Sequence, residues 1–350
     1  MTLEEAISQV KPLDEEKMKI AKKRWDNIAK PLHSLGKMED IITQIVGITG
    51  QEKADISKKV LVAMCADNGV VEEGVTQTGQ EVTAIVADNF VNETTTACVM
   101  CHQCGVDIMP VDVGMVTDTT ARRDFKVAYG TKNMTKGPAM TREEAVKAIE
   151  AGINVVKELK EKGYQMLATG EMGIGNTTTS SAVASVLLKQ PVEAMTGRGA
   201  GLTSEGLVRK INAIKKAIEL NQPDPQDAID VLAKVGGFDI GGMAGVFLGG
   251  AAFGMPVLMD GFISCVSALI AKMICPMAGD YMIASHVSKE PAAHLILEHM
   301  GKDPVLHADM CLGEGTGAIA LCPFIDMGAT LYNTLSTFED INVDQYEELK

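Results

Sequence analysis

The sequence has few aromatic residues, no excess of basic residues and no long strongly apolar run. Aromatic residues make up 4% of the 350, and 32 Lys and Arg stand against 46 Asp and Glu, so the formal net charge is −14. Nucleic acids and anionic membranes require a basic surface, and single strands also use aromatic stacking platforms. The composition therefore argues against both kinds of partner.

Three catalytic signatures are also missing. The sequence contains no G-x-S-x-G elbow, no P-loop ending in Gly-Lys-Ser/Thr, and no G-x-G-x-x-G pattern. Their absence counts against hydrolases, P-loop nucleotide hydrolases and dinucleotide-dependent dehydrogenases. The Gly- and Ala-rich stretch from Ile240 to Met259 predicts a packed helix and a short strand, not a membrane span. The acidic and polar N-terminus predicts that there is no signal peptide, and hence a cytoplasmic protein.

Short apolar runs alternate with helical patterns along most of the chain. The first fifty residues have helical patterns only, with no strand signal. We expect one continuous helix from Gln80 to Cys104. The alternation predicts an α/β fold with a mostly parallel sheet and helices on both of its faces. The predicted strands are Lys59–Ala66, Val106–Val111, Tyr164–Ala168, Pro256–Met259 and Asp280–His286.

A glycine-rich loop follows the predicted strand that ends at Ala168. It contains Glu171 among several glycines, and Asn176 or Thr177 is expected to cap the helix that comes next. Such loops bring backbone N–H groups and a helix N-terminus close to an anion, which predicts a phosphate site. A carboxylate in the loop suits a cation or a sugar hydroxyl better than phosphate. We therefore expect a phosphorylated ligand that also has a positive or hydroxyl-rich part.

Two more glycine clusters lie further along the chain, at residues 196–201 and 313–317. Glu314 lies between two glycines, and a partly desolvated carboxylate there could act as a general base, although an exposed loop glutamate is an equally good interpretation. Arg209 and Lys210 follow the second cluster. Either could neutralise a phosphate, and a solvated helix face is the alternative.

Cys98, Cys101 and Cys104, with His102 between them, have a spacing that resembles a metal site. On a helix, however, positions i, i+3 and i+6 drift around the surface, and no fourth ligand follows at a matching distance. We interpret them as core cysteines and expect neither a metal nor another cofactor.

Four segments together resemble the nicotinate-nucleotide–dimethylbenzimidazole phosphoribosyltransferase family. They are Gly170–Thr178, Thr196–Gly201, Asp280–His286 and Leu312–Ala318, and the resemblance extends from about Pro12 to Asn333. It implies a parallel, Rossmann-like sheet with a small helical domain built from both chain ends, and a dimer. We accordingly expect residues 1–50 and 335–350 to form the small domain and residues 51–334 to form the large α/β domain with the active site.

The resemblance also implies a reaction and a set of site residues. The family is a pentosyl-transferring glycosyltransferase: it moves the phosphoribosyl group of nicotinate mononucleotide to an aromatic base, which gives the α-ribotide of cobamides and releases nicotinate. Glu314 would be the general base, and Glu171 would lie near the ribose and its developing positive charge. The implied substrate-binding residues are Gly173, Gly175, Asn176, Thr177, Gly199, Lys210, Ser288, Gly313 and Gly315.

The sequence departs from the family pattern in two places. It has Asp67-Asn68-Gly69 where the family usually has Asp-His-Gly, and Thr78-Gly79 where the family usually has an aromatic residue followed by Pro. The acceptor thus stays open between 5,6-dimethylbenzimidazole and a related benzimidazole, a purine or a phenolic compound. Two alternatives also stay open: a weakly active or inactive paralogue that dimerises with an active relative, and another phosphoribosyl or nucleotide enzyme with the same phosphate-binding frame.

Overall fold

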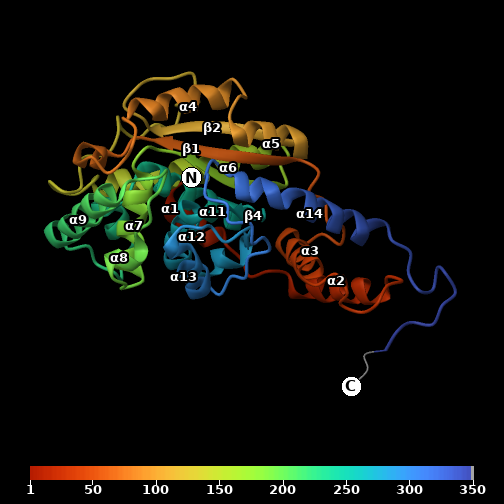
Figure 1. Ribbon diagram of the computed structural model, residues 1–350. Helices are drawn as coiled ribbons and strands as arrows, with labels where there is room; N and C mark the ends of the chain where they lie inside the picture. The colour runs from red at the N-terminus through yellow and green to blue at the C-terminus, as the bar shows by residue number, and fades with distance from the viewer. Residues whose placement is uncertain (348–350) are drawn as a thin grey trace.

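The computed structural model describes residues 1–347, and five parallel strands form one sheet in the order β2-β1-β3-β4-β5 (Figure 1). The predicted mostly parallel α/β fold is therefore confirmed. In this order the chain adds β2 on one side of β1 and all later strands on the other side. Ligands of open parallel sheets bind where the order reverses, at the carboxyl ends of the strands. The strands are β1 Lys59–Ala66, β2 Val106–Gly114, β3 Met166–Met172, β4 Val257–Met259 and β5 Met282–Ala284.

The helices alternate with the strands and also occupy both ends of the chain. Among the described residues, no helix is both long enough and apolar enough to span a membrane. The α-helices are α1 Leu3–Gln9, α2 Glu15–Asn27, α3 Lys37–Thr49, α4 Glu81–Val91, α5 Thr96–Cys104, α6 Arg142–Glu161, α7 Asn176–Leu187, α8 Val192–Met195, α9 Ser204–Asn221, α10 Ala228–Val235, α11 Phe238–Ala252, α12 Phe262–Ile274, α13 Pro291–Met300 and α14 Thr316–Thr334. Two 3₁₀ turns, Gly69–Glu73 and Pro276–Tyr281, complete the set.

The sheet has an apolar core on each face, as period-two side-chain alternation requires. Along β1, Val60 and Val62 join one buried cluster, whereas Leu61 and Ala63 join another. The first cluster contains residues of α6, α7, α10, α11 and α12, and the second contains residues of α2, α3, α5 and α14. Helices thus cover both faces of the sheet, as predicted.

The predicted helix from Gln80 to Cys104 is wrong, because the chain breaks it into α4 and α5. Glu93 has a φ of 58°, in the left-handed region, which a continuous helix cannot contain. Thr95 then caps α5, since its hydroxyl accepts a hydrogen bond from Cys98 N at 3.2 Å. The break creates a new helix N-terminus whose position matters for the site described below.

β3 is longer than predicted at its carboxyl end. It continues through Glu171 to Met172, and Glu171 is in register with Met64 of β1. The expectation that Glu171 lies in the glycine loop is therefore wrong. The neighbouring strand offers hydrogen-bond partners up to Cys65, so pairing continues until the first loop glycine, Gly173.

Helix α2 and the segment after α14 contact each other at one end of the molecule, at the right in Figure 1. Ile28 and Thr337 form an antiparallel bridge, and the rings of Trp25 and Tyr332 lie 5.2 Å apart. α1, in contrast, packs on α6 and α11. We propose that α2, α3 and the C-terminal segment form the small helical unit expected from the sequence; residues 348–350 of that expectation lie outside the described residues.

Helices α6 and α11 cross with almost no space between their backbones. A Cβ on Gly245 would overlap Ile149 O, and one on Gly152 would overlap Gly242 O. Both helices contribute buried residues to the core cluster on this face of the sheet, so neither can move away cheaply. The glycines of the two helices thus determine how closely α6 and α11 pack on each other.

We predict that Gly245→Ala destabilises the protein by about 1–3 kcal/mol, the usual cost of overpacking. Helix propensity alone would give the opposite sign, because Ala is favoured over Gly by about 1 kcal/mol in a helix interior. Urea unfolding measures the change. Gly137→Ala is the matched control, since a Cβ there has no neighbour within 4 Å. Equal stability of the two variants would contradict the close crossing.

Candidate functional site

Polar side chains gather at the carboxyl ends of four neighbouring strands. Asn68 follows β1, Glu171 lies near the end of β3, Asp260 follows β4, and His286 lies two residues after β5. All four side chains are buried. This is the edge at which parallel sheets bind ligands, and it includes the reversal point between β1 and β3.

The loop after β3 directs Asn176 towards two carboxylates. The N-cap of α7 is Gly175, with a φ of 94°, so the expectation that Asn176 or Thr177 caps the helix is wrong. The Asn176 side chain instead donates hydrogen bonds to Glu171 Oε2 and to Asp239 Oδ2, the latter at 3.1 Å. Gly173 is required here, because a Cβ would collide with Asp239 and with Ala66 O.

Glu171 and Asp239 form a buried acid pair joined by Asn176. Burial and, after it, the charge of Asp239 together raise the pKa of Glu171 to about 8, against the hydrogen bond from Asn176, which lowers it. Burial also raises the pKa of Asp239 to about 6, opposed by the side chains of Asn176 and Asn68. Near neutral pH the pair therefore carries less than its full double negative charge, and a cation beside it would stabilise the charged form.

Asp260 holds the third glycine cluster in place. Its carboxylate accepts hydrogen bonds from three backbone N–H groups at the start of α14: Gly315 at 3.2 Å, Gly317 at 2.7 Å and Ala318 at 3.2 Å. Such an acceptor satisfies groups that every helix N-terminus leaves unpaired. The Asp260 carboxylate is also 3.7 Å from His286 Nε2.

Glu314 lies on this anchored loop and reaches α5. Its backbone has a φ of 61°, and its carboxylate accepts a hydrogen bond from Ala97 N at 3.2 Å. Ala97 is the second residue of α5, so the carboxylate lies at the positive end of that helix. The side chain is only partly buried. The helix break at Thr95, which the sequence analysis missed, thus supplies the partner of the predicted base.

The end of β3, which carries Glu171, is in direct contact with the loop that carries Glu314. A Cβ on Gly313 would lie 2.6 Å from Glu171 Oε1, and a Cβ on Gly170 would lie 2.6 Å from Glu314 O. Gly315, with a φ of 92°, packs against the same strand: a Cβ there would lie 2.4 Å from Leu61 Cδ1 and 3.3 Å from Gly170 Cα. The glycines bring both carboxylates into one site.

Lys210 lies on the other side of α7 and is fully buried. Its ammonium donates to Thr177 Oγ1 at 2.8 Å and to Gly197 O at 3.2 Å. Burial lowers the pKa of Lys210 to about 8, opposed by the charge of Glu290. Of the two basic candidates, Arg209 is on the exposed face of α9, where it donates to Gly74 O.

Gly199 and Ser288 complete this second group around Glu290. Gly199 N donates to Glu290 Oε1 at 3.1 Å, and Glu290 N donates to Ser288 Oγ at 3.3 Å. Gly261 links the group to the first one, because a Cβ there would contact both Ser288 and His286. The structure therefore places all the predicted site residues in one connected ring of contacts.

Three residues of this ring were not predicted: Asp239, Asp260 and Glu290. Asp260 could have been found, since it directly follows a predicted strand, as Asp67 and Asp112 do. Asp239 is at the start of a glycine-rich helix and Glu290 is in a polar loop, so neither has a local signal. Both reach the site only through tertiary packing.

The segment where the sequence departs from the family pattern lies beside the second glycine cluster. Gln77 donates a hydrogen bond to Gly201 O, and Thr78 is exposed. Asn68 is fully buried, and its Oδ1 is 3.3 Å from the hydroxyl of Thr179 on α7. Asn68 is therefore part of the wall of the site, whereas Thr78 lies on a surface loop near it.

Cys98 and Cys101 are fully buried in the apolar cluster that contains Phe90, and Cys104 is partly buried. Burial raises the pKa of the Cys101 thiol far above its usual range. Within residues 1–347, no group of three or more His, Cys, Asp or Glu side chains is placed to hold a metal ion. The arrangement fits the interpretation of these residues as core cysteines.

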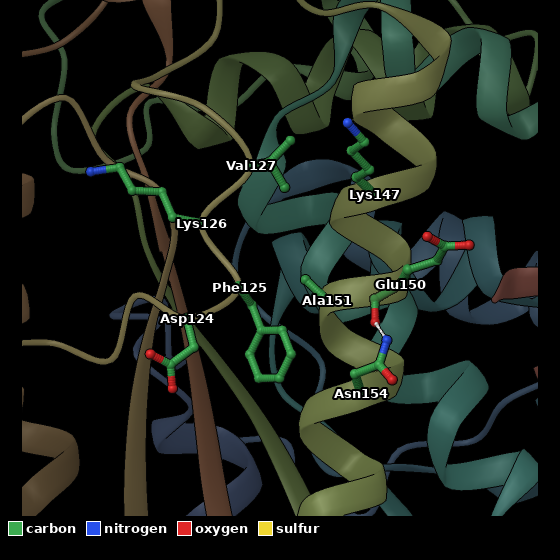
Figure 2. A pocket seen from close by; sticks show the side chains of 8 residues that line it. All are labelled: Asp124, Phe125, Lys126, Val127, Lys147, Glu150, Ala151 and Asn154. Atoms are coloured by element: carbon green, nitrogen blue, oxygen red, sulfur yellow. Dashed lines mark hydrogen bonds between the residues drawn. The ribbon is translucent and has the colours of Figure 1, made fainter. Parts of the chain in front are cut away.

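Two hollows in the surface of the described residues lie away from this ring. One, of about 270 Å³, opens between residues 124–127 and α6, and Figure 2 shows Phe125 facing it from the loop and Ala151 from the helix. Another, of about 690 Å³, adjoins it around Tyr129. Both are lined by exposed charges of both signs, and neither contains a predicted site residue. Buried titratable groups are the stronger indication of a functional site.

Comparisons with known proteins identify the family and support the fold. The family model described as phosphoribosyltransferase matches residues 10–343. A nicotinate-nucleotide–dimethylbenzimidazole phosphoribosyltransferase of Ruminiclostridium cellulolyticum is 50% identical over 352 aligned residues, covering 100% of both chains, and that of Clostridium acetobutylicum is 47% identical with the same coverage. The crystal structure of the enzyme of that name from Thermus thermophilus has a TM-score of 0.88 and 34% identity, over 95% of this chain and 100% of its own.

We predict that Glu171→Gln becomes more stable relative to the wild type as the pH rises. The folded chain holds the Glu171 proton more tightly than the unfolded chain, in which the pKa is near 4.5. Between about pH 4.5 and about pH 8 the folded state binds more protons, so the wild-type free energy of unfolding falls with rising pH. Gln does not titrate, so the variant does not lose free energy of unfolding through this group as the pH rises.

Urea unfolding of both proteins at about pH 5 and about pH 8 measures the difference. Glu193→Gln is the control: a hydrogen bond from Lys215 lowers the pKa of Glu193, so its stability difference should stay constant over this range. A Glu171→Gln difference that also stays constant would contradict the buried, proton-holding pair.

Proposed function

The chain belongs to the nicotinate-nucleotide–dimethylbenzimidazole phosphoribosyltransferase family, and from this premise we propose that it transfers the phosphoribosyl group of nicotinate mononucleotide to an aromatic base. The products are an α-ribotide for the cobamide nucleotide loop and free nicotinate. The observation that carries the proposal is the ring of contacts: Glu171 at the end of β3 and Glu314 on the loop packed against it lie in one ring with a buried lysine and a helix N-terminus.

The phosphate would bind at the Lys210 end of the ring. Lys210, the Gly199 N–H, the Ser288 hydroxyl and the first turn of α7 offer one cation and several donors within a small volume. Lys210 is buried, so its charge is poorly screened by water and attracts an anion strongly. Thr177, already bonded to Lys210, would orient the same group, with Gly173 and Gly175 allowing close approach of the backbone.

The ribose and the pyridinium would lie at the Glu171 end. As the bond from the anomeric carbon to the pyridinium nitrogen breaks, positive charge passes to the ribose, and the electron pair leaves with nicotinate. The Glu171–Asp239 pair would stabilise this positive charge, and Asn176 would keep both carboxylates directed at it. This resolves the apparent conflict of a carboxylate next to a phosphate loop.

Glu314 would take the proton of the incoming base. The base nitrogen attacks the anomeric carbon from the face opposite to nicotinate, which inverts the β-configuration of the substrate to α. The attacking ring must then lose a proton, and Glu314 accepts it. The N–H of Ala97 at the start of α5 orients the carboxylate for this step.

The acceptor is proposed to be 5,6-dimethylbenzimidazole or a related aromatic compound, phenolic compounds included. The surface loop beside the second glycine cluster has Thr78-Gly79 where the family usually has an aromatic residue followed by Pro, and this departure supports an acceptor range wider than 5,6-dimethylbenzimidazole. We propose that the enzyme acts in the cytoplasm as a dimer with itself. The second candidate is an inactive dimer partner of an active relative, which the departures at Asn68 and Thr78 favour.

We predict that the purified chain alone releases nicotinate from nicotinate mononucleotide and forms a riboside with at least one base of a mixed panel. The panel contains 5,6-dimethylbenzimidazole, benzimidazole, adenine, phenol and p-cresol. Chromatography with mass spectrometry identifies the product. If no nicotinate is released with any base, the chain would be an inactive partner, and a complementing subunit would have to be sought.

We predict that Glu314→Gln lowers kcat by about 10²–10⁴-fold, because a general base contributes a factor of that size. The variant keeps the side-chain size and an oxygen for the Ala97 N–H. Steady-state nicotinate release measures the change. Glu298→Gln, on the exposed face of α13, is the control and should retain wild-type turnover. Near-normal turnover of Glu314→Gln would remove Glu314 from the role of base.

A further inference from the structure

Glu290 places a carboxylate within the proposed phosphate subsite. Its Oε1 accepts the hydrogen bond of Gly199 N at 3.1 Å, and its buried Oε2 has no hydrogen-bond partner. A Cβ on Gly197 would overlap this second oxygen, so the carboxylate lies directly against the glycine loop. Glu290 therefore accepts the hydrogen bond of the Gly199 N–H group, which a phosphate oxygen in this subsite would need.

The side chain does not serve its own helix. Glu290 is the N-cap of α13, yet it makes no side-chain capping hydrogen bond. An Asp, Asn, Ser or Thr at this position usually accepts an N–H of the helix that it begins. The Glu290 side chain instead extends to the second glycine cluster, where its partner Gly199 is 91 residues away in the sequence.

Lys210 interacts with the charge of Glu290 but makes no hydrogen bond to it. The ammonium of Lys210 donates to Thr177 and Gly197, while the charge of Glu290 acts on it through space. In the free protein one buried cation is thus balanced by one carboxylate. A phosphate monoester brings up to two negative charges to the same place, and like charges a few ångströms apart in a partly desolvated site repel strongly.

We propose that Glu290 is an internal competitor of the substrate phosphate: it holds the Gly199 N–H in the free protein and turns out of the subsite when the phosphate binds. This rests on the proposed function, which assigns the subsite to phosphate. The same competition would act on the phosphate of the product. Glu290 therefore weakens the binding of both and favours product release.

The test is the affinity of Glu290→Gln for phosphate-bearing ligands, measured by isothermal titration calorimetry. Gln keeps the length of the side chain and an oxygen for Gly199 N but removes the charge. We expect nicotinate mononucleotide and inorganic phosphate to bind about tenfold more tightly, because removing the charge removes a repulsion that the wild type retains. Nicotinate riboside, which lacks the phosphate, should bind as it does to the wild type, and the exposed Glu298→Gln should leave all affinities unchanged.

Three results would overturn the proposal. Weaker binding of nicotinate mononucleotide by Glu290→Gln would make Glu290 a ligand of the substrate, and unchanged binding would make it a bystander. An equal gain for nicotinate riboside would show that the effect does not act on the phosphate. In each of these cases the proposed function stands as long as the wild-type protein releases nicotinate from nicotinate mononucleotide. A wild-type protein that neither binds nicotinate mononucleotide nor releases nicotinate would contradict both the role of Glu290 and the proposed function.

Discussion

The site depends on the close contact between the end of β3, which carries Glu171, and the loop that carries Glu314. Gly170 and Gly313 leave no room for a Cβ, because each would lie 2.6 Å from an atom of the opposing segment. A side chain at either position would push Glu171 and Glu314 apart. Asp260 then fixes the Glu314 loop through three backbone hydrogen bonds at the start of α14. The glycines are thus a condition for two carboxylates to serve one substrate.

The balance of buried charge explains how one site can hold a ligand with both a phosphate and a cationic ring. Acidic groups gather at the ends of β3 and β4, and the fully buried Lys210 lies beyond the first turn of α7. Asn176 and Thr177 are adjacent in sequence, and one faces the acids while the other faces the lysine. A single helix turn therefore joins an end that attracts positive charge to an end that attracts negative charge.

Much of the fold could be predicted from the sequence, because apolar runs and helix caps are local signals. The strand from Lys59 to Ala66 agrees with the structure, and so do the packed helix and short strand predicted between Ile240 and Met259. The break between α4 and α5 could not be predicted, because a polar link within a long helical pattern has no strong local signature. Glycine loops with embedded charges indicated most of the site. Asp239 and Glu290 could not be predicted, because only packing brings them to it.

The most direct test of this account is a crystal structure of the protein with nicotinate mononucleotide bound. The account predicts that the phosphate contacts the Lys210 ammonium and the Gly199 N–H, and that the anomeric carbon lies beside Glu171 with Glu314 on the opposite side of the ribose. A nucleotide bound elsewhere, for example in the hollow between residues 124–127 and α6, would contradict it, as would a phosphate placed against Glu171.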